Sequence, residues 1–425
     1  MDAQPSPGKR IAFIAVSVML VLLCAELASY IVLNKFIPSR VKTRAAFRAA
    51  EDYVAAHNKA VASSPRLAAE QNQAANDDSR HHIKMFHPVL GWDYPPNLEY
   101  TDSRGVAYHH GPGGARWTCT EFKENLVATY GDSFTYSADE EDCHSWQTYL
   151  GEKIHGNVLN FGVSGYGSDQ AYLKYELNSA RVWTPVVILG ILPDNINRVV
   201  NVFRTFYVPS GFMGLTKPRY VRKGEAFELL SNPLGSPKDM SKFQNPAFVR
   251  ELGENDYWYR QDTSLPRLGF PYTLSLILWR GYLWEHVAFS LNLPRGTSGV
   301  HFFPGNLFEE KEPLAVMCHV VDQFVKTAKA RNSRPVVVIM SHKELVLETR
   351  KYGVSRMNNL VKHLHAKGYD FIDLIQAMVD MNTTREQLDS WYREHATPEG
   401  NKVIAHIIGA HLEREGYVPK ESSGR

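Results

Sequence analysis

The sequence predicts an α/β protein built around a parallel sheet, preceded by an apolar helix. Short apolar runs rich in β-formers alternate with segments of helical spacing along most of the chain. This alternation calls for a parallel sheet with helices on both faces. One run, Val186–Leu192, is continuously apolar, as strands are when both faces of their sheet are covered. The content of 44% hydrophobic and 22% charged residues is that of a globular protein.

Charge and cysteine content exclude several classes of protein. The formal net charge is +2, and no half of the chain carries a concentrated basic field, which argues against nucleic acid as a partner. The 4 cysteines have no metal-ligand spacing, and no metal or cofactor is expected. Cys119 and Cys143 are close enough in sequence for a disulfide in an oxidising compartment, while reduced, buried thiols are the preferred alternative.

An apolar run near the N-terminus predicts a transmembrane helix over residues 11–33, after a cytoplasmic tail of residues 1–10. Glu26 is the only charge in Ile11–Leu33, and the run is long enough to span a bilayer. A cleavable signal peptide is the main rival, but a good small-x-small cleavage site is missing. We therefore expect an uncleaved anchor in the inner (cytoplasmic) membrane.

The orientation of this anchor is ambiguous. Basic residues after the span outnumber the two before it; they are Lys35, Arg40, Lys42, Arg44 and Arg48. Read literally, the positive-inside rule places the following domain in the cytoplasm.

Three further segments follow the anchor. Residues 34–84 predict a helical stalk and linker, in which His81 and His82 are expected to be solvated rather than metal ligands. Residues 85–425 form the globular domain. An insertion around residues 200–314, rich in Pro, Gly and aromatic residues and partly helical near Tyr272–Trp284, interrupts it.

Strand-like and helix-like runs alternate within the globular domain. The expected strands are Leu126–Tyr130, Val158–Phe161, Val186–Leu192, Pro335–Met340 and Tyr369–Leu374. The expected helices include segments near Asp169–Tyr175, Val316–Ala330, Ser355–His365 and Asn401–Arg414.

Four candidate residues each follow one of these strands. Ser133 follows the first, Gly165 the second and Asn195 the third. His395 lies beyond the last strand, just before the final helix. The carboxyl ends of parallel strands share one edge, so these residues are expected to converge. A serine, a histidine base and preorganised donors are what acyl transfer requires.

The residues around these positions resemble the SGNH (GDSL-type) hydrolase superfamily over roughly Leu126–Ala405. Gly131-Asp132-Ser133 is similar to its first block and Asn160–Gly167 to its second. The resemblance implies a three-layer, flavodoxin-like sheet. It also implies that Ser133 is the nucleophile, with its own N–H and that of Gly165 as oxyanion-hole donors.

Two blocks depart from the family pattern. The usual Gly-x-Asn-Asp appears as Gly190–Asn195, in which Asn195 is the nearest amide for the third donor, while another alignment places Pro193 there. Tyr392 stands where the family has the Asp before its catalytic His. His395 is therefore expected to be the base, oriented by Asp389, by Glu394, by a backbone carbonyl or by no group; Asp389 is preferred.

The architecture also resembles SGNH-like proteins that modify bacterial surface polysaccharides, including the alginate O-acetylation group. This implies a serine esterase or O-acyltransferase acting on O-acyl groups, chiefly acetyl, of a cell-surface carbohydrate. It also implies a periplasmic domain and a membrane-protein partner from a polysaccharide assembly system. The alternatives are an inactive glycan-binding or assembly subunit and a cytoplasmic lipase-like esterase.

Some aromatic and basic residues are candidates for sugar contacts. The aromatic candidates for stacking on sugar rings are Trp146, Tyr166, Tyr207 and Trp258, although such residues more often belong to the core. Lys217-Pro218-Arg219 fits either an anionic-glycan contact or a solvated basic turn.

Overall fold

A parallel sheet forms the centre of the protein. The structure is a computed structural model that describes residues 7–63, 85–208, 216–264, 266–291, 303 and 305–418. The 5-stranded sheet consists of β5 (Asn125–Tyr130), β6 (Asn157–Asn160), β7 (Val186–Ile191), β10 (Arg334–Ile339) and β11 (Phe371–Asp373). The spatial order is β11-β10-β7-β5-β6, and all neighbouring strands are parallel. Read from β6, this is the flavodoxin-like order. The predicted fold class is confirmed.

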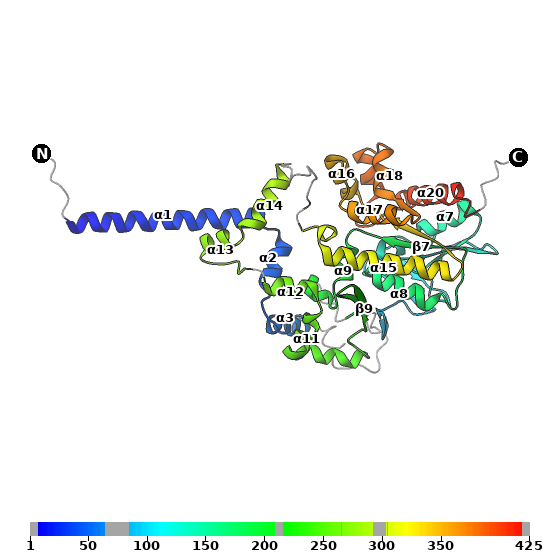
Figure 1. The fold of residues 1–425 in the computed structure, drawn as a ribbon, viewed down its shortest axis with the longest axis horizontal. Coiled ribbons are helices and arrows are strands. Elements are labelled where there is room, and N and C mark those ends of the chain that lie inside the picture. The colour runs from blue at the N-terminus through cyan, green and yellow to red at the C-terminus, as the bar shows by residue number, and fades with distance from the viewer. Residues whose placement is uncertain are drawn as a thin grey trace.

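Helices cover both faces of this sheet (Figure 1). On one face α7 (Trp146–Ile154) packs against α20 (Pro398–Arg414). On the other, α8 (Ser168–Asn178) packs against α15 (Lys311–Ala330). Because both faces of the sheet are covered, the central strand β7 is apolar throughout rather than alternating.

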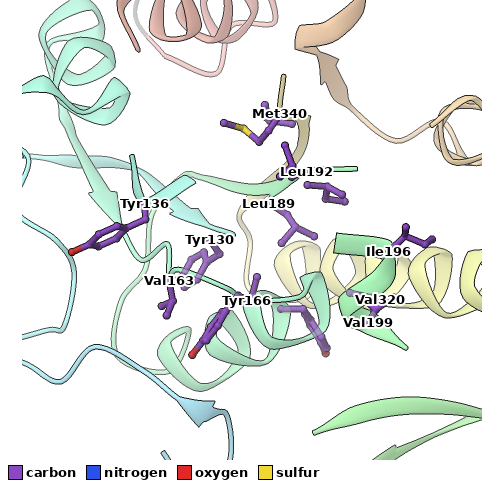
Figure 2. Close-up of a cluster of buried hydrophobic side chains, with 14 of the residues drawn as sticks. Tyr130, Tyr136, Val163, Tyr166, Leu189, Leu192, Ile196, Val199, Val320 and Met340 are labelled. Atoms are coloured by element: carbon purple, nitrogen blue, oxygen red, sulfur yellow. The ribbon is translucent and has the colours of Figure 1, made fainter. Parts of the chain in front are cut away.

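The central strands supply the core. Every residue of β7 is buried, as are the last residues of β10. Figure 2 shows Leu189 of β7 and Met340, just after β10, among other buried side chains, which include Val199 and Val320 from neighbouring helices. Burying one such side chain contributes about 1.5–3 kcal/mol, so these contacts hold the carboxyl ends of the strands in place.

Smaller elements surround this sheet. The two-stranded antiparallel sheets are β1 (Phe86–His87) with β2 (Gly91–Trp92), β3 (Glu99–Thr101) with β4 (Ala107–His109), and β8 (Arg219–Lys223) with β9 (Ala226–Leu230). Short helices of the sheet domain are α6 (Ser133–Tyr136), η1 (Asp142–His144), α9 (Asn195–Val199), η3 (Leu307–Glu309), α16 (Lys343–Tyr352), α17 (Asn358–Lys367), α18 (Leu374–Asp380) and α19 (Arg385–Trp391).

The N-terminal helix α1 (Pro7–Phe36) projects away from the rest of the protein (Figure 1). It is long and apolar enough to cross a membrane, a property shared by membrane anchors and signal sequences. Two helices follow, α2 (Ser39–Ala45) and α3 (Ala50–Ser63). The remainder of the predicted linker, including His81 and His82, lies outside the described residues.

The predicted insertion connects these N-terminal helices to the sheet domain. Besides β8 and β9 it contains α10 (Arg204–Tyr207), η2 (Pro237–Gln244), α11 (Pro246–Glu254), α12 (Tyr257–Ser264), α13 (Tyr272–Leu278) and α14 (Arg280–Ser290). Helix α11 packs against α3, α13 against α1, and β8 against α15. The insertion is therefore the structural link between the apolar helix and the sheet.

Gly131 marks the turn at the end of β5, and its substitution tests how tightly that turn is packed. A Cβ atom at Gly131 would lie 2.0 Å from Thr135 Oγ1 and 2.9 Å from the carbonyl oxygen of Gly190. We expect Gly131→Ala to lower the free energy of unfolding by about 1–3 kcal/mol, the usual cost of overpacking. Gly113→Ala, where a Cβ meets nothing within 4 Å, is the matched control for denaturant unfolding. Equal stability of the two variants would contradict a tight turn.

Candidate active site

Ser133 lies at the carboxyl edge of the sheet, directly after the turn that ends β5. It is the first residue of α6, and Asp132 caps this helix by accepting a hydrogen bond from the Phe134 N–H at 3.0 Å. The backbone thus turns sharply between strand and helix. Asp132 shapes this turn, and Ser133 lines a cavity at the edge of the sheet.

His395 reaches this serine from the loop between α19 and α20. Its Nε2 lies 2.9 Å from Ser133 Oγ, although the two residues are 262 positions apart. The Phe134 ring packs against the imidazole with a centroid distance of 4.8 Å. Thr397 caps α20 through the Gly400 N–H at 3.3 Å and so fixes the end of the loop that carries the histidine.

The carboxylate beside His395 belongs to Asp139. Its Oδ2 lies 2.6 Å from His395 Nδ1. An ionised carboxylate can only accept a hydrogen bond, so this contact assigns the proton to Nδ1 and leaves Nε2 to accept from the Ser133 hydroxyl. The side chains of His395 and Asp139 are only 15% and 14% exposed. Serine, histidine and aspartate form one continuous chain of hydrogen bonds.

Asp389, the preferred candidate for orienting His395, is placed elsewhere. Its Oδ1 pairs with Lys343 Nζ at 3.1 Å, on the exposed side of α19. Glu394, the other candidate, accepts from Arg104 at 3.3 Å. The expectation of a carboxylate close to the histidine in sequence is wrong, because the loop after Ser133 supplies it. The only sequence signal was an acidic run, Asp139–Asp142, shortly after Ser133.

The β3–β4 hairpin holds Asp139 in an uncommon backbone conformation. Its φ of 76° lies in the left-handed region, which costs a non-glycine residue about 1–3 kcal/mol unless its surroundings fix it. The Asp139 N–H donates to the Tyr108 hydroxyl at 3.0 Å, and Arg104 pairs with its Oδ1. Asp139 is therefore fixed through both its backbone and its carboxylate.

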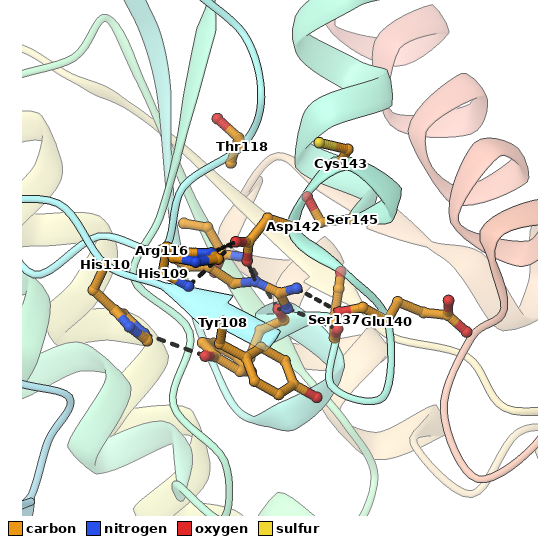
Figure 3. A network of polar contacts seen from close by, with 12 residues as sticks. Tyr108, His109, His110, Arg116, Thr118, Ser137, Glu140, Asp142, Cys143 and Ser145 are labelled. Carbon is orange, nitrogen blue, oxygen red and sulfur yellow. Dashed lines mark hydrogen bonds and ion pairs between the residues drawn. The ribbon is translucent and has the colours of Figure 1, made fainter. Parts of the chain in front are cut away.

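A buried guanidinium organises the loop that carries Asp139 (Figure 3). Arg116 Nε donates to Asp142 Oδ1 at 2.7 Å, and Nη1 donates to the carbonyl oxygens of Tyr136 and Ser137 at 2.7 and 2.9 Å. Its side chain is 0% exposed, and it stacks on the ring of Tyr108 at 4.6 Å. One side chain thus pins both ends of the segment that contains Asp139.

A disulfide joins Cys119 and Cys143 next to this loop. The sequence left a bridge and free thiols open, and the structure contains the bridge. It links η1, at the end of the Asp139 loop, to the chain just after Arg116. The covalent link and the Arg116 hydrogen bonds therefore restrain the same loop.

Gly165 lines the same cavity as Ser133, as the resemblance implied. Its φ is +83°, and an added Cβ would lie 2.9 Å from Arg204 Nη1, so only glycine suits the position. The Gly165 carbonyl accepts from Arg204 Nη1 at 3.0 Å. This contact fixes the loop that would present the Gly165 N–H.

Asn195 does not occupy the place expected of an oxyanion donor. Its amide nitrogen donates to Asp132 Oδ2 at 2.9 Å and to the Tyr166 carbonyl at 3.3 Å, and its oxygen accepts from the Leu192 N–H at 2.8 Å. It is only 1% exposed and is not among the residues that line the cavity. Asn195 is the first residue of α9. Its side chain bonds to Asp132, in the turn before Ser133, and to backbone groups of Tyr166 and Leu192, so it links these loops.

The cavity above Ser133 is predominantly charged and polar. Its volume is about 450 Å³, and its charged lining includes Asp102, Arg104, Arg198, Arg204 and Glu394. A second cavity of about 400 Å³ shares Phe134 and Glu394 with it. The serine therefore faces a space that suits a polar ligand.

Burial shifts the protonation equilibria of two groups at this site. Burial lowers the pKa of His395 below its ordinary value; Asp132 and Glu394 oppose this shift, while Arg104 and Arg198 add to it. Burial also lowers the pKa of Arg204 to about 10, so it stays cationic at neutral pH. His395 is thereby kept neutral and able to accept a proton.

The predicted sugar-contacting residues are not available at the surface. Trp146, Tyr166, Tyr207 and Trp258 are all buried in the hydrophobic core. Lys217 forms a buried ion pair with Asp169, and Arg219 is 0% exposed. These residues stabilise the fold, and neither expectation for Lys217-Pro218-Arg219, a glycan contact or a solvated turn, is met.

Comparison with known proteins finds structural likeness only. No protein-family model and no curated protein matches the chain. It is similar to a putative lipolytic protein of the G-D-S-L family from Desulfitobacterium hafniense DCB-2, at 10% identity and TM-score 0.33, covering 68% of this chain and 100% of that one. It is also similar to the psychrotrophic esterase EstA from Pseudoalteromonas sp., at 9% identity and TM-score 0.32, covering 69% and 98%. Likeness of this size carries no conclusion about activity, so the chemistry of the chain rests on its own residues.

Proposed function

We propose that this protein is a serine esterase or O-acyltransferase that uses Ser133, His395 and Asp139. The observation that carries this proposal is the unbroken hydrogen-bond chain, with 2.9 Å from Ser133 to His395 and 2.6 Å from His395 to Asp139. A serine hydroxyl is a weak nucleophile until a neighbouring base removes its proton, and the base requires a fixed orientation. The proposed nucleophile, its base and the group that orients the base lie together at the carboxyl edge of the sheet.

The reaction would proceed through an acyl-enzyme. His395 Nε2 takes the Ser133 proton as Oγ attacks the acyl carbonyl, and Asp139 stabilises the resulting imidazolium. The N–H groups of Ser133 and Gly165 would stabilise the developing oxyanion. The imidazolium then protonates the departing alcohol. Neutral His395 next activates water, which gives hydrolysis, or a sugar hydroxyl, which gives transfer.

An acylated carbohydrate is the substrate class that the cavity favours. Charged residues, including Arg104, Arg204 and Glu394, line the space above Ser133 and suit a polyhydroxylated ligand better than a long alkyl chain. The neighbouring cavity provides room for an acceptor or a leaving sugar. A small acyl group such as acetyl, on a cell-surface polysaccharide, fits both features and the family resemblance. A membrane protein of a polysaccharide assembly system remains the proposed partner.

We also propose that α1 is a retained anchor and that the catalytic domain is extracytoplasmic. Leu33 and Ile37 at the end of α1 form a buried cluster with Trp279 and Leu283 of the insertion, and cleavage of α1 as a signal sequence would expose it. The Cys119–Cys143 disulfide favours an oxidising compartment. The buried cluster weighs against cleavage of α1, and the disulfide weighs against the orientation that the basic residues after the span suggest.

A non-catalytic glycan-binding subunit is the weaker alternative. This alternative was suggested by Tyr392, which stands where the family that the chain resembles has an aspartate. Asp139 supplies that carboxylate from a different loop, so the loss that motivated this alternative has not occurred.

Active-site labelling tests the proposed catalytic residues. We expect a fluorophosphonate probe to label the protein and p-nitrophenyl acetate to give an acyl-enzyme burst, both lost in Ser133→Ala. Asp139→Asn should lower kcat by about 10³–10⁴-fold, because the neutral amide favours the wrong histidine tautomer. Asp389→Asn, which alters only surface ion pairs with Lys343 and Arg385, is the matched control and should retain wild-type activity. Folded protein with neither label nor burst would refute the enzyme proposal.

The pH profile tests the environment of His395. The base must be neutral, and its lowered pKa keeps it neutral below the ordinary histidine value of about 6.5. We therefore expect kcat/KM for p-nitrophenyl acetate to stay above half of its plateau at pH 6.5, and to reach half only at a lower pH, where it passes through the lowered pKa. An acidic midpoint clearly above 6.5 would show that pairing with Asp139 outweighs desolvation.

A further inference from the structure

We propose that the segment from Arg267 to Arg280 is a second membrane element, a re-entrant turn that lies in the lipid beside α1. The bilayer is its partner. This inference rests on α1 being the retained anchor, and it is independent of the catalytic role of Ser133. The evidence comes from the contact with Glu26, the exposed apolar surface, and the way the segment satisfies its own backbone.

Helix α13 packs along the half of α1 that lies nearer the globular domain (Figure 1). The Tyr30 and Tyr272 rings meet edge to face at a centroid distance of 5.0 Å. Ser29 Oγ donates to Thr273 Oγ1 at 3.4 Å. The contact therefore lies within the apolar run of α1, and not at its end.

Glu26 accounts for the position of this contact. Its carboxylate accepts hydrogen bonds from the Tyr272 N–H at 2.5 Å and the Thr273 N–H at 3.1 Å, the first N–H groups of α13. A charged side chain and unpaired backbone donors are both costly in lipid. Here the Glu26 carboxylate accepts from the Tyr272 and Thr273 N–H groups, so the charge and the donors are partners of one another. The only charge of the apolar run is thus explained by a partner at the same depth.

The lengths of the two helices agree with this placement. Glu26 precedes Leu33, the end of the apolar run, by about 10 Å of helix at 1.5 Å per residue. Helix α13 has 7 residues, which again span about 10 Å. The first residues of α13 lie beside Glu26. Trp279, the residue after the last one of α13, packs with Leu33. The helix therefore extends from the depth of Glu26 to the membrane surface.

The outer surface of the segment is apolar and exposed. The side chains concerned are Phe270, at 78% exposure, and Leu274, Ile277 and Leu278, at 52%, 52% and 48%. No charged residue occurs between Arg267 and Arg280. This surface continues the exposed apolar surface of α1, where Leu27 is 60% exposed. Lipid that surrounds α1 would cover the apolar surface of α1 and that of the segment.

Ser275 satisfies part of the irregular backbone that precedes α13. Ser275 Oγ accepts from the Gly269 N–H at 3.1 Å, and it lies 2.7 Å and 3.3 Å from the carbonyl oxygens of Gly269 and Arg267. Irregular backbone at membrane depth needs protein partners for its polar groups, and Ser275 provides such partners for Gly269 and Arg267. The two arginines that bound the segment would lie at the headgroup level, where charged side chains are favoured.

Depth-dependent fluorescence quenching of the full-length protein in lipid nanodiscs tests this inference. The free cysteines Cys24 and Cys318 are replaced by serine, and the Cys119–Cys143 disulfide is kept. A bimane label is then placed at a single new cysteine. The positions are Leu274→Cys in the segment, Leu27→Cys on α1 as the lipid-exposed reference, and Leu229→Cys on β9 as the water-exposed control.

We expect the label at position 274 to behave like that at position 27. Doxyl lipids should quench it several-fold more than they quench the label at position 229, and aqueous iodide should quench it several-fold less. Behaviour like position 229 would overturn the inference. Protection from both quenchers would also overturn it, since a second copy or another protein would then cover the surface. Loss of the label at position 27 by cleavage would refute the anchor itself, and would leave the labelling of Ser133 unaffected.

Substitution of Glu26 tests the link between the two elements. In the position-274 background, Glu26→Leu removes both acceptors for the N–H groups of α13, whereas Glu26→Gln keeps one carbonyl oxygen. We expect iodide quenching at position 274 to rise in Glu26→Leu and to rise less in Glu26→Gln. Identical quenching in the parent and both variants would contradict the role of Glu26 in holding α13 within the membrane.

Discussion

The buried guanidinium of Arg116 is the interaction on which the geometry of the active site depends. It has no contact with Ser133 or His395, yet it holds the carbonyl oxygens of Tyr136 and Ser137 and the carboxylate of Asp142. The segment between these contacts carries Asp139. A buried charge is stabilising only when its partners are complete, and loss of one partner typically costs about 3–5 kcal/mol. The contacts of Arg116 with Asp142, Tyr136 and Ser137 offset the cost of burying its charge. The same contacts keep the Asp139 loop in one conformation.

The sheet gathers the other parts of the site. Parallel strands end at a common edge, so the loops that carry Ser133, Gly165 and Asn195 arrive together. Asp132 joins these loops because its carboxylate accepts from Asn195 and from Arg198 at 2.9 and 3.2 Å. Asn195 thus contributes to the rigidity of the turn before Ser133, and not to the surface of the cavity. A rigid site of this kind orients its reacting groups before substrate binds.

The insertion gives this domain a defined relation to the apolar helix. It packs against α1 and α3 at one side and against α15 at the other, so the apolar helix is not flexibly attached. The buried cluster around Leu33 and Trp279 makes α1 part of the folded structure. The proposed anchor would therefore hold the sheet domain at a fixed distance from the bilayer.

The sequence alone determined the fold class, the order of the strands along the chain, the apolar helix and the convergence of Ser133, Gly165 and His395. These follow from hydrophobic periodicity and from the topology of parallel sheets, both of which are local or nearly local properties. Only the tertiary structure decided which carboxylate meets His395, whether Cys119 and Cys143 are joined, and which groups Asn195 contacts. Each depends on the path of a loop, and loops follow long-range contacts, such as those of Arg116, that no short stretch of sequence encodes. For this reason Asp389, near His395 in the chain, lies apart from it, while Asp139, 256 positions away, lies within 2.6 Å of its ring nitrogen.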